Sequence, residues 1–372
     1  MKRTGLLLTL LLEGVCGSFA QNRVVAYFSG TLSQLDSFDV RKVTHLIFCF
    51  GHLDGSRFKL DSAKDTAMIQ KMVSLRSKNP ALKILVSMGG WGGCESCSDG
   101  FSTSEKRKEF AMSVKEITMY FKTDGVDIDW EYPTVRLDND IDKNPVHKNT
   151  PEDKDHFTDL VRKLRNTLGK NATITFAAGG FNTYLKHALD WKQVIRYIDF
   201  INLMTYDLIN GYSIETGHHS PLYSTLKDPE SVDHAVRYLV KNGVDPGKIV
   251  IGAAFYARIW ENVPPQNNGL YQTAKFKESV PYNQFEDVLS EKNGYQYHWD
   301  DTAKAPYSYC ATQKTFATYD DKRSVQLKTQ YVIDNKLGGI MFWELGSDVY
   351  CKGLLDAIFD TASKTMVEPA YK

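Results

Sequence analysis

The sequence of 372 residues lacks an excess of charge of either sign. Lysine and arginine together number 45, and so do aspartate and glutamate, which makes the formal net charge zero at pH 7. Proteins that bind nucleic acid carry a surplus of basic residues to neutralise phosphates, and this chain has none. We therefore expect no nucleic-acid partner.

Long apolar runs are missing beyond the N-terminus. Lys2 and Arg3 precede an apolar run at 6–12, and Ser18-Phe19-Ala20 has the small-x-small pattern of a cleavage site. The run is too short to span a bilayer. The residues around Cys16 do not fit a lipoprotein signal. Residues 1–20 are therefore predicted to be a secretory signal peptide, and the mature protein is expected to be extracellular, or periplasmic in a bacterium, with no membrane contact.

Cysteine is scarce, with five residues left after the predicted cleavage. The C-x-x-C spacing of Cys94 and Cys97 is compatible with a redox or metal motif, but no second such pair or histidine cluster completes a zinc site. A local disulfide is expected in an oxidising compartment. Cys310 and Cys351 are the hypothetical second pair. Cys49, between two phenylalanines, is predicted to be a buried free thiol.

The most informative stretch is residues 124–133, DGVDIDWEYP. If it forms a strand, Asp127, Asp129 and Glu131 share one face and three large apolar residues share the other. Neighbouring carboxylates repel one another and resist desolvation, so such a face costs stability. A solvated acidic strand is the alternative, but the apolar back and the terminating Pro133 favour an active site.

Short apolar runs alternate with amphipathic segments along the rest of the chain. The eight predicted strands are 23–30, 44–51, 83–91, 124–131, 174–180, 199–207, 248–256 and 338–344. Most are continuously apolar, as expected of a parallel sheet covered on both faces. Eight strands with helices between them predict an α/β fold, a (β/α)8 TIM barrel.

Capping and proline signals place the helices. A helix is predicted over Asp65–Asn79, ended by Pro80, and a second after the capping-box sequence Ser102–Glu105. Thr150 before Pro151 is expected to cap a third, closed by Gly169. A fourth is expected to open at Asp228-Pro229.

One connection is irregular. Residues 259–318 are rich in Tyr, Asn, Gln and Pro, and are too many for an ordinary barrel connection. They are predicted to form an inserted subdomain between strands seven and eight, with 21–258 and 319–372 forming the barrel. No internal repeat, low-complexity tract or separate carbohydrate-binding module is recognisable.

The acidic stretch resembles a known family. Asp124, Asp127, Asp129 and Glu131 stand in the D-x-x-D-x-D-x-E pattern of family 18 glycoside hydrolases, the chitinase family. The segment 87–91 (SMGGW) resembles the family's S-x-G-G element, and 204–207 (MTYD) its M-x-Y-D element. The resemblance covers essentially the whole mature chain. It implies cleavage of β-1,4-linked N-acetylglucosamine polymers, chitin and its oligosaccharides, with the insertion as a small α+β domain beside the substrate groove.

The resemblance also implies roles for the acids. Glu131 would be the general acid, with a pKa expected to be raised by adjacent Asp129. Asp129 would hold the 2-acetamido N–H of the substrate and share a proton with Asp127, while Tyr206 would donate to the acetamido carbonyl. The reaction would be substrate-assisted, would retain configuration, and would need no cofactor and no metal. Asp124, on the other strand face, is expected to be structural.

Barrel enzymes act at the C-terminal ends of their strands. The candidate substrate-binding residues near those ends are Tyr27, Trp91, Met204, Asp207, Tyr212, Tyr256, Arg258 and Trp343. Trp343 resembles the family's tryptophan beneath the reacting sugar. Ser87, Gly89 and Gly90 are expected to support the crowded interior beside the acids. Ser29-Gly30-Thr31 departs from the family, because many chitinases carry a tryptophan there.

The pattern leaves two alternatives. Endo-β-N-acetylglucosaminidases of the same family share the acids but often differ on strand six and commonly lack the insertion. Barrel-type chitin-binding lectins usually lose the terminal glutamate, which is present here as Glu131. The M-x-Y-D match, the insertion and Glu131 therefore favour a chitinase.

Several other features have plainer interpretations. Glu344 is expected to contact substrate or cap its strand, and the adjacent His218 and His219 are more simply loop residues than metal ligands. Asn171 opens a glycosylation sequon that matters only in a host that glycosylates. The charged stretch 136–148 is expected to be a solvated loop near the active face. Without an oligomer signal, the protein is expected to be a monomer.

Overall fold

The structure is a computed structural model in which residues 22–135 and 149–364 are described. The predicted signal peptide and the charged stretch 136–148 lie outside these ranges. Within them, no helix has the length and apolar character that a membrane crossing requires.

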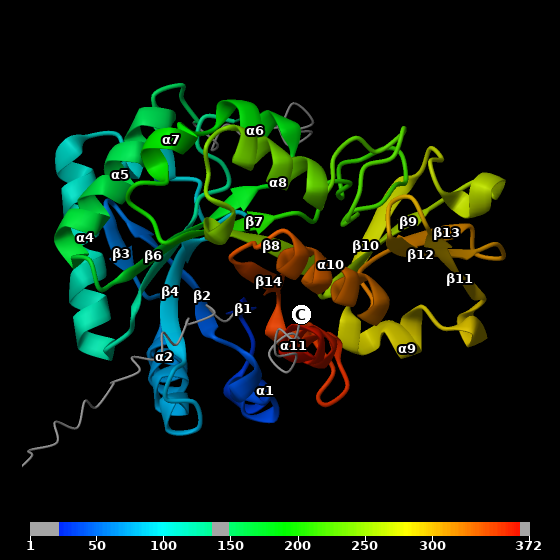
Figure 1. Cartoon of the computed structure of the whole chain (residues 1–372), viewed down its shortest axis with the longest axis horizontal. Helices are drawn as coiled ribbons and strands as arrows, with labels where there is room; N and C mark the ends of the chain where they lie inside the picture. Colours follow the sequence, from blue (N-terminus) through cyan, green and yellow to red (C-terminus); the bar gives the residue numbers. More distant parts are fainter. Residues whose placement is uncertain (1–21, 136–148, 365–372) are drawn as a thin grey trace, which may run out of the picture.

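Eight parallel strands close into a barrel (Figure 1). They are β1 Arg23–Phe28, β2 His45–Asp54, β4 Lys83–Gly89, β5 Gly125–Asp129, β6 Thr173–Gly179, β7 Phe200–Met204, β8 Ile249–Ala254 and β14 Gly339–Trp343. Each pairs with its neighbour in chain order, and β14 pairs with β1 to close the ring. The predicted (β/α)8 barrel is therefore confirmed. The acidic strand ends at Asp129, so Glu131 follows it rather than ending it. An unpredicted short strand, β3 Arg57–Lys59, forms a hairpin with β2.

Helices surround the barrel (Figure 1). The longer ones are α2 Ala63–Ser74, α4 Ser104–Phe121, α5 Asp153–Leu168, α8 Val232–Lys241, α10 Lys322–Asp334 and α11 Leu354–Lys364. The shorter ones are α1 Leu32–Ser37, α3 Cys97–Gly100, α6 Asn182–His187 and α7 Trp191–Val194. In α2 the helical run begins at a Ser62 capping box and changes to a 3-10 turn at Leu75, earlier than predicted.

Three predicted caps are wrong by one to three residues. Thr103, not Ser102, caps α4, because its side chain accepts from the backbone N–H of Lys106. Ser231, not Asp228, caps α8 in the same way. Helix α5 begins at Asp153, whose carboxylate accepts from the backbone N–H of Thr150 at 2.8 Å. For α4 and α8 the side chain that reaches an unpaired backbone N–H decides the start, whereas Glu152, the residue before α5, makes no such bond.

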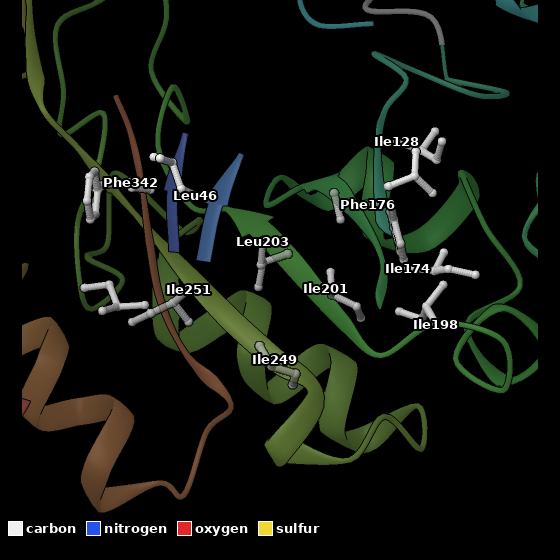
Figure 2. Close-up of a cluster of buried hydrophobic side chains, with 14 of the residues drawn as sticks. Leu46, Ile128, Ile174, Phe176, Ile198, Ile201, Leu203, Ile249, Ile251 and Phe342 are labelled. Atoms are coloured by element: carbon white, nitrogen blue, oxygen red, sulfur yellow. The ribbon is translucent and has the colours of Figure 1, made fainter. Parts of the chain in front are cut away.

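Alternate side chains of the barrel strands form two apolar layers. The outer layer packs between strands and helices and includes Ile128, Phe176, Leu203, Ile251 and Phe342 (Figure 2). The inner layer fills the barrel and includes Tyr27, Ile47, Leu85, Met204 and Met341. Burial of each such side chain contributes roughly 1.5–3 kcal/mol, and the outer layer is what allows β5 to turn acids inward.

A second sheet lies between β8 and β14 in the sequence and beside the barrel in space (Figure 1). Its five antiparallel strands have the order β10-β9-β13-β12-β11. They are β9 Tyr256–Glu261, β10 Lys275–Pro281, β11 Tyr295–Asp300, β12 Ala305–Cys310 and β13 Thr315–Thr318, with the short helix α9 Phe285–Val288. Strand β9 starts ahead of the predicted boundary at 259, so Tyr256 and Arg258 belong to this sheet. The domain boundaries stay a prediction.

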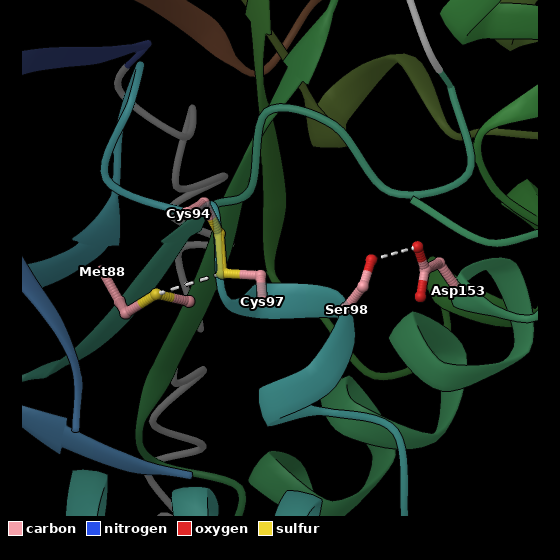
Figure 3. The surroundings of a disulfide bond; sticks show 5 residues. All are labelled: Met88, Cys94, Cys97, Ser98 and Asp153. Atoms are coloured by element: carbon pink, nitrogen blue, oxygen red, sulfur yellow. Dashed lines mark hydrogen bonds between the residues drawn. A yellow bond between two sulfur atoms is a disulfide. The ribbon is translucent and has the colours of Figure 1, made fainter. Parts of the chain in front are cut away.

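The cysteines agree with two of three predictions. Cys94 and Cys97 form a disulfide beside Met88, next to a hydrogen bond of 2.5 Å from Ser98 to Asp153 (Figure 3). Within the described residues Cys49 is buried and free, as predicted.

The hypothetical Cys310–Cys351 pair is wrong. Within the described ranges both thiols are free. Cys310 is enclosed in the core of the second sheet, whereas Cys351 lies in an exposed turn before α11. The two sulfur atoms belong to different parts of the fold and do not meet.

Candidate active site

Asp127 is the most enclosed acid of β5, with no exposed surface. Its carboxylate accepts four hydrogen bonds, from the Tyr27 hydroxyl at 3.1 Å, Ser87 Oγ at 2.8 Å, Thr175 Oγ1 at 2.5 Å and Asn202 Nδ2 at 3.1 Å. Burial raises the pKa of Asp127, and these neutral donors oppose the rise.

Thr175 and Asn202 were missed by the sequence interpretation. Each is the polar residue inside an otherwise apolar strand, β6 or β7, and this was the available signal. Strand register then brings them to Asp127, since Thr175 is the residue of β6 that pairs with it.

Asp129 is also buried, but it is not enclosed by donors. Its Oδ1 has no hydrogen-bond partner among the described residues. Burial is the largest cause that raises the pKa of Asp129 well above its ordinary value, followed by the charges of Glu131 and Asp127. A buried carboxyl with an open acceptor is costly, so this position is suited to a ligand that supplies an N–H.

Glu131 stands just beyond β5. Burial raises its pKa to about 7, the charge of Asp207 adds to the rise, and a hydrogen bond with Tyr132 opposes it. The predicted direction is found, but the predicted cause is not the main one: burial, not repulsion by Asp129, has the largest effect. Tyr132, which sequence reasoning did not single out, is therefore part of the site.

Tyr206 follows the end of β7. Its hydroxyl lies 3.9 Å from the Met341 sulfur, and its ring meets the Tyr256 ring edge-on at 6.2 Å. Burial raises the pKa of Tyr206 well above 10, so the hydroxyl keeps its proton and is available as a donor. Met204 lies in the inner apolar layer beneath it.

Asp207 has a left-handed backbone, with φ of 56°. The Arg258 guanidinium donates to both of its oxygens, at 2.8 Å and 2.5 Å. Burial alone would raise the pKa of Asp207, but contacts with His219 and Arg258 lower it below the ordinary value. Both residues were predicted as substrate contacts, and the structure joins them in an ion pair between the barrel and β9.

Aromatic rings surround the acids. Trp343 stacks on Phe50, with ring centroids 5.5 Å apart, and lies 6.1 Å from Tyr27. Trp91 is 56% exposed and lies between Tyr132 at 6.5 Å and Tyr212 at 6.2 Å. Such rings provide flat apolar faces on which sugars can stack.

Gly89 and Gly90 have backbone angles φ of 111° and 80°, which favour glycine. A Cβ atom on Gly89 would lie 2.1 Å from the Asp129 carbonyl oxygen, and one on Gly90 would lie 2.6 Å from the Phe50 ring. Any side chain at either position would displace the strand that carries Asp129 or the ring beneath Trp343.

The remaining candidates are not at the acids. Asp124 precedes β5 and binds Arg76, Lys83 and the backbone N–H of Ile84. Glu344 accepts from the Ser29 backbone N–H at 2.6 Å and hydroxyl at 2.8 Å, which links the ends of β14 and β1.

A metal site is not evident: no group of three or more His, Cys, Asp or Glu side chains within 22–135 and 149–364 is arranged to hold a metal ion. His218 instead lies 3.0 Å from Asp300, and His219 lies beside Asp207.

Comparison with known proteins gives a consistent result. The family model "Glycosyl hydrolases family 18" matches residues 23–348. Chitinase A1 of Niallia circulans is 35% identical over 75% of this chain, which spans 42% of that relative's length.

Solved structures agree. A glycoside hydrolase family 18 N-acetylglucosaminidase from Paenibacillus barengoltzii has a TM-score of 0.82 and 34% identity, covering 91% of this chain and 99% of its own. Chitinase ChiA74 from Bacillus thuringiensis has a TM-score of 0.84 and 28% identity, covering 94% and 71%. With a family match over most of its length and this site at the ends of its barrel strands, the chain belongs to glycosyl hydrolase family 18.

Proposed function

We propose that this protein is a secreted chitinase that cleaves β-1,4-linked N-acetylglucosamine polymers by a retaining, substrate-assisted mechanism. The observation that carries the proposal is the raised pKa of the Glu131 carboxyl at the end of the acidic stretch. Because burial raises its pKa to about 7, it holds a proton near neutral pH and can give it to a departing glycosidic oxygen.

The first step breaks the glycosidic bond. Glu131 protonates the departing oxygen while the substrate's own 2-acetamido oxygen attacks the anomeric carbon, which gives an oxazolinium ion and a Glu131 carboxylate. In the second step Glu131 takes a proton from water, and the hydroxide oxygen attacks the anomeric carbon from the side the leaving group left. The acetamido group is restored, Glu131 regains its proton, and configuration is retained.

The neighbouring residues orient the acetamido group. Asp129, with its open Oδ1, would accept the acetamido N–H and stabilise the cation. Tyr206 keeps its proton and would donate to the acetamido oxygen. Proton sharing between Asp129 and Asp127 requires one donor to leave, because four hydrogen bonds already fill the acceptor positions of Asp127.

Substrate position follows from the aromatic rings. Trp343 would lie beneath the reacting sugar, and exposed Trp91, with Tyr212 beside it, would stack on a further sugar of the chain. The Tyr27 hydroxyl donates to Asp127, and the predicted contact of its ring with substrate stays part of the proposal. Arg258 acts first on Asp207, so its effect on substrate would be through that carboxylate.

Two further features belong to the proposal. Export is supported by the signal-like residues 1–20 and by the Cys94–Cys97 disulfide, which forms in oxidising compartments. A second candidate activity is that of an N-acetylglucosaminidase, favoured by the likeness to a family 18 N-acetylglucosaminidase along nearly its whole length.

Product analysis tests the function. Purified mature protein would be incubated with N-acetylglucosamine hexamer and, separately, with a high-mannose glycoprotein, with Glu131→Gln as the blank. We expect hexamer cleavage with the β-anomer formed first. Dimers and trimers would indicate a chitinase, and monomer alone an exo-acting N-acetylglucosaminidase. Glycan release only would indicate an endo-β-N-acetylglucosaminidase, and binding without cleavage a lectin.

A further inference from the structure

His219 is a buried imidazole that the proposed mechanism does not use. It has no exposed surface, and among the described residues neither ring nitrogen has a well-formed hydrogen bond. Its backbone N–H donates to Thr318 Oγ1 at 3.2 Å, which fixes the residue to the end of β13. A buried polar ring without a partner costs free energy, so its presence needs an explanation.

The neighbouring Asp207 carboxylate offers an explanation. Nδ1 of His219 lies 3.5 Å from Oδ1 of Asp207, at the outer limit of a hydrogen bond. The same oxygen accepts from Arg258 Nε, so the carboxylate lies between a cation and an imidazole. The His219 ring is held against Tyr256, with centroids 5.3 Å apart and planes inclined by 62°. His219, from the loop after β7, and Arg258, from β9, therefore hold one carboxylate whose left-handed backbone already restricts it.

We propose that His219 is a positioning residue that orients the Asp207 carboxylate at the edge of the active site. The inference rests on the acid role proposed for Glu131. His219 does not contact the reacting atoms in this scheme. It donates from Nδ1 to Asp207, in the neutral form that burial favours by lowering its pKa.

Several other charged or titratable groups act on the same residues. Those around His219 are Asp207, Arg258, Asp320 and Tyr256. Those around Glu131 are Asp129, Asp207, Tyr132, Tyr184 and Tyr206. Of these groups around Glu131, Asp207 is the one that His219 contacts directly. Tyr206 is linked to His219 only through the Tyr256 ring, so the Asp207→Asn background is needed to separate the two routes.

The direction of the effect follows from charge. The charge of Asp207 raises the pKa of Glu131. A donor at Asp207 partly offsets that charge, so its removal should raise the pKa of Glu131 further. For His219→Leu we expect a rise of about half a unit. His219→Asn keeps a side-chain donor and should restore part of the wild-type value.

His218 offers a matched control on the same loop. It is equally buried, but it pairs with Asp300 at 3.0 Å instead of Asp207. His218→Leu therefore removes a comparable ring and should leave the pKa of Glu131 where it is.

The test measures the Glu131 carboxyl directly. Protein labelled with 13C at glutamate Cδ would be titrated by NMR, with Glu131→Gln identifying the resonance, and the alkaline limb of kcat/KM for the hexamer would be recorded in parallel. The titration does not require activity. An inactive wild type would therefore refute the proposed function, while the NMR titration of Glu131 would still test this inference. A folded His219→Leu with unchanged Glu131 titration would overturn the inference.

Two further results separate positioning from a general structural effect. In an Asp207→Asn background, His219→Leu should cause no additional shift, and an equal shift there would overturn the inference. If His219→Leu does not fold, 15N-histidine spectra of wild type and Asp207→Asn still decide. We expect a proton on Nδ1 of His219 whose resonance moves in Asp207→Asn, and an unprotonated Nδ1 would contradict the proposal.

Discussion

The two ends of β5 hold the same kind of side chain in opposite conditions. Before the strand, Asp124 is joined to Arg76, Lys83 and the Ile84 backbone N–H, and these bonds lower its pKa against the effect of burial. At its other end, burial raises the pKa of Asp129, the last residue of the strand, and of Glu131 just beyond it. Carboxylates paired with cations contribute stability, whereas desolvated carboxylates without a cation cost stability and hold protons, so the difference separates structure from chemistry.

Glu131→Gln should cause the largest loss of activity of any substitution at the two ends of β5. The amide keeps the shape but has no proton to give, so we expect kcat to fall by about 10²–10⁴-fold with little change in KM or melting temperature. Steady-state kinetics on the hexamer measure it. Glu344→Gln is the matched control, because the Glu344 carboxylate already accepts hydrogen bonds from Ser29. Its kcat should fall by less than about tenfold. Near-normal turnover by Glu131→Gln would remove it from the acid role.

Asp129→Asn should have the next largest effect. It replaces a carboxylate with an amide that cannot neutralise the developing cation, and we expect kcat to fall by about 10²-fold. Removal of a buried ionisable group next to Glu131 should also leave stability unchanged or slightly higher, which thermal unfolding can measure. A variant that is destabilised but fully active would place Asp129 with Asp124 as a structural acid.

The acidic face was predictable because successive side chains of a strand point to opposite faces, so acids at every second position must share one face. Its surroundings were less so. Thr175 and Asn202 reach Asp127 through strand register between β5, β6 and β7, which no single segment encodes. Asp207 and Arg258 were each recognised alone, but their ion pair depends on how the second sheet is placed against the barrel.

Caps and cysteines show a second limit. Ser102 and Thr103 are both residue types that cap helices, and only the backbone path decides which one reaches the N–H of Lys106. The Cys310–Cys351 hypothesis came from elimination, which contains no distance. Local chemistry was therefore predictable, whereas contacts between distant segments required the fold.

Asp207 is an exception to this comparison, because it is a carboxylate of the active-site end of the barrel that is nevertheless paired with a cation, Arg258. Asp207→Asn removes a charge that raises the pKa of Glu131 and leaves Arg258 without its partner. Both changes favour the ionised form of Glu131, so its pKa should fall from about 7 by about half a unit to one unit. Since protonated Glu131 is the active form in the proposed mechanism, the alkaline limb of kcat/KM should move to lower pH. A limb that stays or moves upward would contradict the assigned interaction.

The smallest effect on activity should come from Asp124→Asn. Its carboxylate is 18% exposed, so loss of the ion pairs should lower the free energy of unfolding by about 1 kcal/mol while kcat stays within about twofold. The pKa of Asp124 is lowered by folding, so its contribution is present above the unfolded-state pKa and lost as pH falls through the folded-state pKa. Urea unfolding at pH 7 should therefore separate variant from wild type, and the difference should shrink below about pH 4. A difference that persists in acid would mean that the hydrogen bond to Ile84, not the charge, is what Asp124 contributes.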